Sequence, residues 1–163
     1  EAKKMCNNVN NNISANVHFC KTGYVYLDAI LNVVYEKAIE NDIDFSVDCK
    51  DNLSFVAGDD LAVLIGNLAD NAVEALAKEQ NKKLKISIFQ NGSYGVLNVQ
   101  NYCSSSVLRT NPTLYTSKED KKNHGRGISI VKSIAKKYGG DVIISEKNNE
   151  FIVSVVLDNR IFT

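Results

Sequence analysis

Three stretches of the chain carry apolar residues at the three-and-four spacing of an amphipathic helix. They predict helices over about residues 27–38, 60–78 and 125–138. The apolar positions are Leu27, Ile30, Leu31, Val34 and Ala38, then Leu61, Leu64, Ile65, Leu68, Ala72 and Leu76, and finally Ile128, Val131, Ile134, Ala135 and Tyr138. Gly139-Gly140 ends the last helix, as glycine commonly does at a helix C-terminus.

Between the helices, apolar and polar residues alternate with the period of a strand that is buried on one face. These alternating runs lie at 43–47, 84–89, 96–100, 142–145 and 151–157, and a further short strand is expected at 53–56. The turn signal Asn91-Gly92-Ser93 predicts that residues 84–101 form an antiparallel hairpin. Gly58-Asp59-Asp60 predicts a turn whose acids cap the following helix.

Strand pairs separated by helices favour an α+β fold over a wound parallel sheet. We expect a two-layer α/β sandwich, in which about three helices cover one face of a mixed, mostly antiparallel sheet. Residues 102–124 show no regular pattern, and a loop of that length in a compact domain is usually functional or disordered. Residues 1–22 are rich in asparagine and are expected to be a linker or the tail of an upstream helix, so the domain proper spans 23–163.

Composition narrows the class of protein without identifying it. The chain has 163 residues, 44% of them hydrophobic and 23% charged, which is typical of a soluble domain with a sizeable core. Lysine and arginine together number 19, as do aspartate and glutamate, so the net charge is zero. No long-range electrostatic attraction to nucleic acid is therefore expected. The four cysteines lack zinc-site spacing and are expected to be reduced thiols. No apolar run reaches 18 residues, and the start at Glu1 suggests a fragment of a longer protein.

The helix expected at 60–78 carries an unusual polar face. Asn67, Asn71 and Glu74 stand at i, i+4 and i+7, so they share one side of the helix beside its apolar side. Ordinary solvent exposure explains such residues about as well as a site does. An asparagine carbonyl is, however, a hard oxygen ligand of the kind Mg²⁺ takes, and Glu74 is a second candidate ligand.

A Gly-x-Gly sequence opens the last predicted helix. Gly125 and Gly127 flank Arg126, and glycine lets the backbone approach a ligand closely. The first turn of a helix presents free N–H groups and the positive end of its dipole, which together suit a phosphate group. The sequence contains neither a P-loop nor a Rossmann fingerprint, so this motif alone is weak evidence.

The two motifs together resemble those of a known superfamily. GNLADNAVEAL at 66–76 and HGRGISIVKSIAKKYGG at 124–140 are similar to the N box and the glycine-rich G box of the GHKL ATPases. The intervening hairpin and the sequence TSKEDKKNHGRG, which leads into the G box, most resemble the histidine-kinase branch. Within that branch they most resemble the quorum-sensing kinases of the accessory-gene-regulator type. The resemblance spans roughly residues 22–160 and implies a Bergerat-type ATP-binding fold.

By position, the resemblance implies a set of residues that bind ATP and Mg²⁺. Asn71 matches the Mg²⁺-chelating asparagine, and Asn67 matches the upstream N-box residue near the phosphates; both are the catalytic candidates. Residues 102–124 match the ATP lid. The cofactor-binding set implied is Asn67, Asn71, Asn101, Lys118, His124, Gly125, Arg126, Gly127 and Ile128.

Two departures from the superfamily pattern bear on the chemistry. In the superfamily, the aspartate of an Asp-x-Gly-x-Gly motif binds the adenine amino group. Here Asn101 takes the place of that aspartate, and Cys103 takes the place of the first glycine. An asparagine carbonyl can still accept a hydrogen bond from adenine. Asn67 stands where gyrase-type ATPases have a glutamate that activates water, and an amide is not a general base. The resemblance therefore implies phosphoryl transfer rather than hydrolysis.

The expected partners follow from the same resemblance. The acceptor histidine would lie on a helical dimerisation domain upstream, since His18 lacks the expected acidic neighbour, and a response regulator would receive the phosphoryl group. The parent protein would be a membrane-bound homodimeric receptor with this domain in the cytoplasm. Two alternatives stay open. One is a nucleotide-sensing or non-catalytic docking module of the same fold. The other is a clamp-type ATPase, which is disfavoured because Asn67 stands in place of an acid.

Overall fold

The computed structural model of the protein describes residues 20–110 and 127–162. The helices are α2 (Val25–Glu40), α3 (Gly58–Leu76), α4 (Val107–Thr110), α5 (Gly127–Lys137) and the 3₁₀ turn η1 (Asn159–Phe162). The strands are β1 (Asp44–Cys49), β2 (Lys83–Asn91), β3 (Tyr94–Tyr102), β4 (Asp141–Lys147) and β5 (Glu150–Asp158). Among these residues, no helix is long and apolar enough to cross a membrane.

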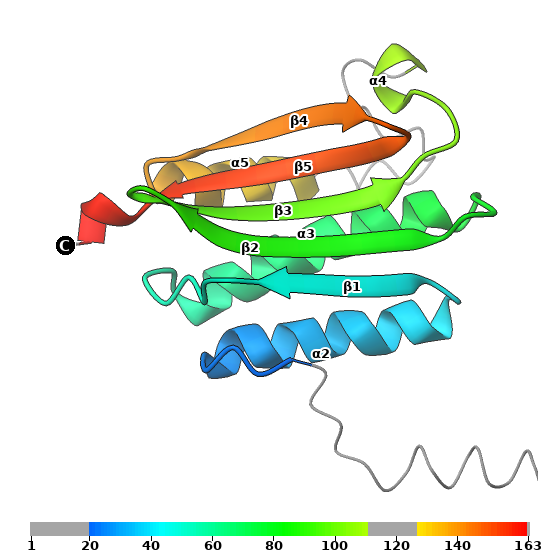
Figure 1. Ribbon diagram of the computed structural model, residues 1–163. Helices are drawn as coiled ribbons and strands as arrows, with labels where there is room; N and C mark the ends of the chain where they lie inside the picture. The colour runs from blue at the N-terminus through cyan, green and yellow to red at the C-terminus, as the bar shows by residue number, and fades with distance from the viewer. Residues whose placement is uncertain (1–19, 111–126, 163) are drawn as a thin grey trace, which may run out of the picture.

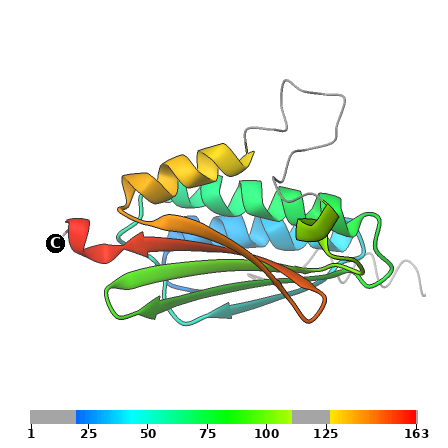
Figure 2. The same ribbon diagram turned by 90° about the horizontal axis from the view of Figure 1, so that it is seen from above.

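The five strands form one mixed sheet in the order β1-β2-β3-β5-β4. β1 runs parallel to β2, and every other neighbouring pair is antiparallel. Figures 1 and 2 show α2, α3 and α5 side by side on one face of this sheet. The expected two-layer α+β sandwich is therefore confirmed, as are the three long helices and the hairpin of β2 and β3.

Helix α3 is the central element of the helical layer. It contacts α2 on one side and α5 on the other, and its inner side faces β2 and β3. Its predicted apolar stripe is buried, and the buried positions are Leu61, Leu64, Ile65, Leu68, Ala69, Ala72 and Leu76. At about 25 cal/mol per Å² of apolar surface removed from water, this burial is the main force that fixes the helix. The polar side of α3 is consequently turned away from the sheet.

Three local predictions were wrong. Residues 53–56 form a turn instead of a strand, because Leu53 has a φ of 51° and the N–H of Val56 donates to its carbonyl. Asp59 and Asp60 do not cap α3, because the helix starts earlier, at Gly58. Its N-cap residue is Ala57, which makes no side-chain hydrogen bond to the first turn. The segment after β3 was expected to lack regular structure, but its described part, residues 103–110, contains the four-residue helix α4.

The C-terminal end of α5 is fixed to the N-terminal end of α3. The buried Tyr138 hydroxyl donates to Asp60 Oδ2 at 2.7 Å and accepts from the Ala57 N–H at 2.9 Å. Lys137 Nζ lies 2.6 Å from the same Asp60 oxygen. Partial burial alone would raise the pKa of Asp60, but the hydrogen bonds from Lys137 and Tyr138 outweigh it and hold that pKa below its ordinary value.

The two glycines after α5 have separate roles. Gly139 has a φ of 61°, the left-handed conformation that ends a helix at low cost for glycine. Gly140 passes so close to β5 that a Cβ there would lie 1.7 Å from the Val156 carbonyl oxygen. The predicted helix stop is confirmed, and it also allows the chain to turn directly into β4.

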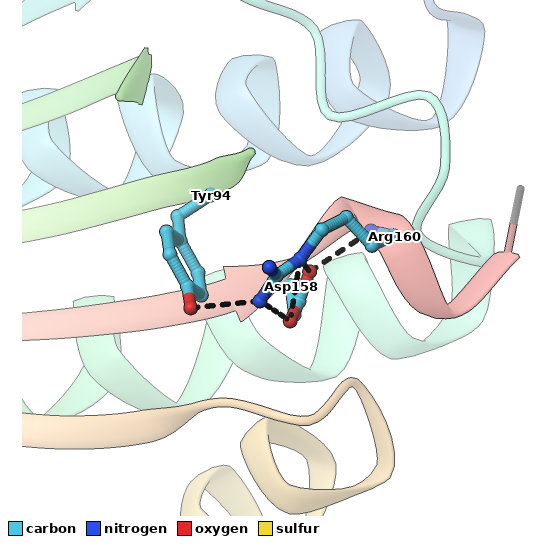
Figure 3. A network of polar contacts seen from close by, with 3 residues as sticks. All are labelled: Tyr94, Asp158 and Arg160. Carbon is cyan, nitrogen blue, oxygen red and sulfur yellow. Dashed lines mark hydrogen bonds and ion pairs between the residues drawn. The ribbon is translucent and has the colours of Figure 1, made fainter. Parts of the chain in front are cut away.

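A polar network holds the chain after β5 against the start of β3. Figure 3 shows Arg160 between Asp158 and Tyr94, with Nη2 at 2.7 Å from Asp158 Oδ2 and 3.0 Å from the Tyr94 hydroxyl. The hydrogen bonds from Arg160 lower the pKa of Asp158. Because Tyr94 begins β3 and Asn101 lies near its end, this network lies at the opposite end of β3 from Asn101.

The Asp60 contacts predict a pH dependence of stability. Because the pKa of Asp60 is lower in the folded state, its contribution is complete above the unfolded-state pKa of about 4 and is lost as pH falls through the folded-state pKa. Replacing Asp60 by asparagine should lower the free energy of unfolding at neutral pH. The gap between the two proteins should narrow between about pH 5 and pH 2 in urea unfolding. A constant gap across this range would show that the Asp60 charge does not stabilise the fold.

Candidate functional site

The polar face of α3 presents its two asparagines differently. Asn67 is half-buried, and its Nδ2 donates to the Val63 carbonyl at 2.7 Å, one turn earlier in the helix. This bond orients the amide, because the nitrogen is engaged by the helix backbone and the carbonyl oxygen faces away from it. Asn71 and Glu74 are exposed on the same side.

Helix α5 begins directly against these amides. A Cβ placed on Gly127 would lie 3.2 Å from Asn67 Oδ1 and 3.7 Å from Asn71 Nδ2. The first distance is tighter than an ordinary van der Waals contact, so a side chain at Gly127 would require the Asn67 amide to shift by a few tenths of an ångström. The fold thus brings together three of the predicted site residues, which come from two motifs more than fifty positions apart in the sequence.

The arrangement combines two chemical features at one place. The first turn of α5 carries backbone N–H groups without helical partners and the positive end of the helix dipole. Beside it, the Asn67 and Asn71 amides supply carbonyl oxygens and N–H donors. An anion and a hard cation can be bound side by side there, which is what a magnesium-complexed phosphate group requires.

The described residues hold no cluster of three or more His, Cys, Asp or Glu side chains that would bind a metal ion alone. A magnesium ion at this site would therefore take only part of its coordination from the described residues. Asn71 is exposed on α3 beside the start of α5, and its carbonyl oxygen could serve as one ligand. Phosphate oxygens and water molecules would complete the octahedral shell, as is common for Mg²⁺.

Asn101 lies near the end of β3 and is only 5% exposed. It pairs in register with Leu84 and Phe151, and its Nδ2 donates to the Tyr102 carbonyl at 3.0 Å. Cys103 is buried two residues later, and its N–H donates to the Asn149 carbonyl at 2.8 Å. Burial, together with nearby glutamates, raises the pKa of the Cys103 thiol, which is therefore uncharged at neutral pH.

The remaining predicted site residues divide into two groups. Ile128 is half-buried, and its side chain packs against the hydrophobic core, so its backbone N–H in the first turn of α5 is the group suited to an anionic ligand. Lys118, His124, Gly125 and Arg126 lie outside the described residues, and their roles stay predictions.

Two glutamates that the sequence patterns do not mark contact the segment after β3. Glu79 accepts hydrogen bonds from Ser104, and Glu146 accepts them from Ser106 and the start of α4. These contacts join residues 25 to 40 positions apart in the sequence. No local pattern marks either acid, because the partners meet only once the domain is folded.

A family model described as the GHKL domain matches residues 58–158, which is more than half of the chain. The matched region runs from the start of α3 to the end of β5, and so includes the hairpin of β2 and β3, α4, α5 and β4. The chain therefore belongs to the GHKL domain family. A search of the curated proteins gave no match.

Solved structures of similar fold include three histidine kinases, one of them represented by its catalytic domain. The nucleotide-free catalytic domain of the histidine kinase ThkA is 20% identical, covers 82% of this chain and 92% of its own, and has a TM-score of 0.66. The mycobacterial sensor histidine kinase MprB is 16% identical, with coverages of 82% and 93% and a TM-score of 0.60. The Acinetobacter baumannii histidine kinase AdeS is 15% identical, with coverages of 82% and 62% and a TM-score of 0.60. At these identities the likeness shows a shared fold.

The contact at Gly127 gives a direct test of the site. Replacing Gly127 by alanine should weaken binding of a magnesium-complexed ATP analogue by about tenfold or more, because the added Cβ presses on Asn67 Oδ1. Thermal unfolding should change little, since alanine favours a helix over glycine. Ser133→Ala, on an exposed position of α5, serves as the control. If Gly127→Ala and the control bind the ATP analogue with equal affinity, Gly127 is not part of the binding site.

Proposed function

We propose that this chain is the ATP-binding catalytic domain of a two-component sensor histidine kinase. In this role it transfers the γ-phosphoryl group of ATP to a histidine. The observation that carries the proposal is the approach of Gly127 to the amides of Asn67 and Asn71, which joins the N box and the G box into one site. Membership of the GHKL domain family supports ATP as the ligand.

The residues present suit transfer better than hydrolysis. Bound magnesium would neutralise charge on the phosphates, and the N–H groups at the start of α5 would hold the phosphate oxygens. Asn71 would ligate the metal, and Asn67 would orient the phosphates beside it. Neither amide can accept a proton from water, so this face of α3 offers no general base apart from the exposed Glu74.

At the other end of the nucleotide, Asn101 is the residue proposed to bind adenine. Its Nδ2 is engaged by the Tyr102 carbonyl, so its Oδ1 is the atom suited to accept from the adenine amino group. The amide carries no charge, and a neutral acceptor contributes less than a carboxylate would. We therefore expect adenine to contribute only modestly to affinity.

The partners belong to the proposal as well. The acceptor histidine would lie on an upstream helical dimerisation domain of the same protein, and a response regulator would receive the phosphoryl group. The parent protein would be a membrane-bound homodimer with this domain in the cytoplasm, of the quorum-sensing, accessory-gene-regulator type. The resemblance of residues 66–76 and 124–140 to that branch supports these assignments.

A second candidate is a docking module of the same fold that binds nucleotide weakly or without catalysis. The observation that favours it is the adenine end of the site. There Asn101 replaces an acid and already donates to a neighbouring carbonyl, and the buried Cys103 replaces a glycine.

Autophosphorylation of the full-length protein tests the kinase proposal. Asn71→Ala should lower the rate by about 100-fold or more, because it removes the only protein ligand proposed for the metal. Its thermal unfolding should match that of the wild type, since Asn71 is exposed. Asn91→Ala, an exposed asparagine at the distant hairpin, is the matched control. A wild-type rate in Asn71→Ala would contradict the proposal, and a wild type that never autophosphorylates would favour the docking module.

A further inference from the structure

Asn101 is a polar residue on the face of the sheet that the helices cover. Residues of β3 point alternately to its two faces, and Leu97, Val99 and Asn101 share the buried face. Leu97 and Val99 belong to the hydrophobic core, and Asn101 is only 5% exposed. A side-chain amide that is buried to this extent normally has hydrogen-bond partners for both its nitrogen and its oxygen.

Only the nitrogen of the Asn101 amide has such a partner. Nδ2 donates to the Tyr102 carbonyl at 3.0 Å, and because a carbonyl oxygen can only accept, this bond fixes which end of the amide faces Tyr102. Within residues 20–110 and 127–162, no group donates to Asn101 Oδ1. This oxygen is not sealed from solvent either, since the one sealed side-chain polar atom without a partner in those ranges is Asn98 Oδ1. Asn101 thus holds a free acceptor that an incoming ligand can reach.

The end of β3 lies beside the end of α3. Glu79, in the loop after α3, accepts from both the N–H and the hydroxyl of Ser104, each at 3.1 Å. Ser104 follows Asn101 by three residues. Asn71 lies five residues before the end of α3 at Leu76, which is roughly 8 Å along the helix axis. A nucleotide whose phosphates lie at Asn71 can therefore reach the end of β3 with its base.

The two purine bases differ at the position that such an acceptor would contact. Adenine carries there an amino group that donates a hydrogen bond, and guanine carries a carbonyl oxygen that accepts one. An ionised aspartate only accepts, so at that position it suits adenine alone. The Asn101 amide suits both bases, because Oδ1 accepts from adenine as the side chain stands, and after a half-turn of the amide Nδ2 donates to guanine.

The Tyr102 carbonyl decides between these two orientations of the amide. After the half-turn, Oδ1 faces the Tyr102 carbonyl, and the 3.0 Å hydrogen bond is lost. Tyr102 is only half-buried, so water can take the place of the lost donor. One hydrogen bond between neutral groups changes an equilibrium constant by about two- to tenfold. The preference for adenine that follows from this bond is correspondingly small.

We propose that Asn101 is a specificity-determining residue that makes the base site weakly selective, so that the chain binds guanosine triphosphate as well as ATP. The hydrogen bond to the Tyr102 carbonyl sets the remaining preference for adenine. This inference rests on the proposed function of the site as a magnesium-nucleotide site. It adds a second class of nucleotide to that site.

Calorimetry on the whole chain tests the inference, with the magnesium complexes of non-hydrolysable ATP and GTP analogues as the ligands. Both analogues should bind the wild type, the ATP analogue more tightly by about two- to tenfold. Saturation with the ATP analogue should abolish the binding heat of the GTP analogue, because the two nucleotides compete for one site.

Substitutions of Asn101 should change the ratio of the two affinities. Asn101→Asp should raise the preference for the ATP analogue to about 100-fold or more, because a carboxylate cannot donate to guanine in either orientation. Asn101→Ala should bring the ratio close to one, and it keeps the test decisive if a buried carboxylate unfolds the aspartate variant. Asn91→Asp adds the same charge at an exposed position of the hairpin and should keep the wild-type ratio. Thermal unfolding of each variant reports whether it is folded.

Two results would overturn the inference. One is a wild type that binds the ATP analogue but binds the GTP analogue more than about 100-fold less tightly. The other is a folded Asn101→Ala or Asn101→Asp variant with the wild-type ratio of affinities, which would show that Asn101 does not contact the base. Failure of the wild type to bind the ATP analogue would instead contradict the proposed function itself, so the two failures are distinguishable.

Discussion

The contact between Gly127 and the amides of Asn67 and Asn71 is the constraint on which the site depends. Everything proposed for this domain requires the start of α5 to lie against the polar face of α3. That approach leaves no room for a side chain at Gly127 without displacing Asn67. It places backbone donors, a helix dipole and two amides around one small volume, which is the arrangement that an anionic, magnesium-bearing ligand needs.

The rest of the fold maintains this contact from a distance. Tyr138 and Lys137 fix the far end of α5 to Asp60 at the start of α3, so both ends of α5 contact α3. The buried stripe of α3 holds that helix on the sheet, and Gly140 lets the chain pass close to β5. Glu79 and Glu146 accept hydrogen bonds from Ser104 and Val107, and so hold the chain where it leaves β3 just after Asn101.

Periodicity and turn signals were enough to predict the helices, the hairpin and the layered architecture, because each of these is encoded within about twenty neighbouring residues. The same reasoning proposed Asn67, Asn71 and Gly127, which the fold brings together. It failed where tertiary contacts decide. Asp60 was expected to cap its own helix and instead bonds to α5, and α4 exists because of an acid on a later strand. Such pairings leave no local pattern in the sequence.

Calorimetric titration of the wild-type domain with a non-hydrolysable ATP analogue, with and without Mg²⁺, tests the central claim most directly. If the amides of α3 and the start of α5 form a magnesium-nucleotide site, binding will be saturable, with one nucleotide per chain. The affinity should fall when Mg²⁺ is removed, because the Asn71 carbonyl would hold the ion, which would neutralise charge on the phosphates. The absence of any binding heat up to millimolar analogue with Mg²⁺ present would contradict it.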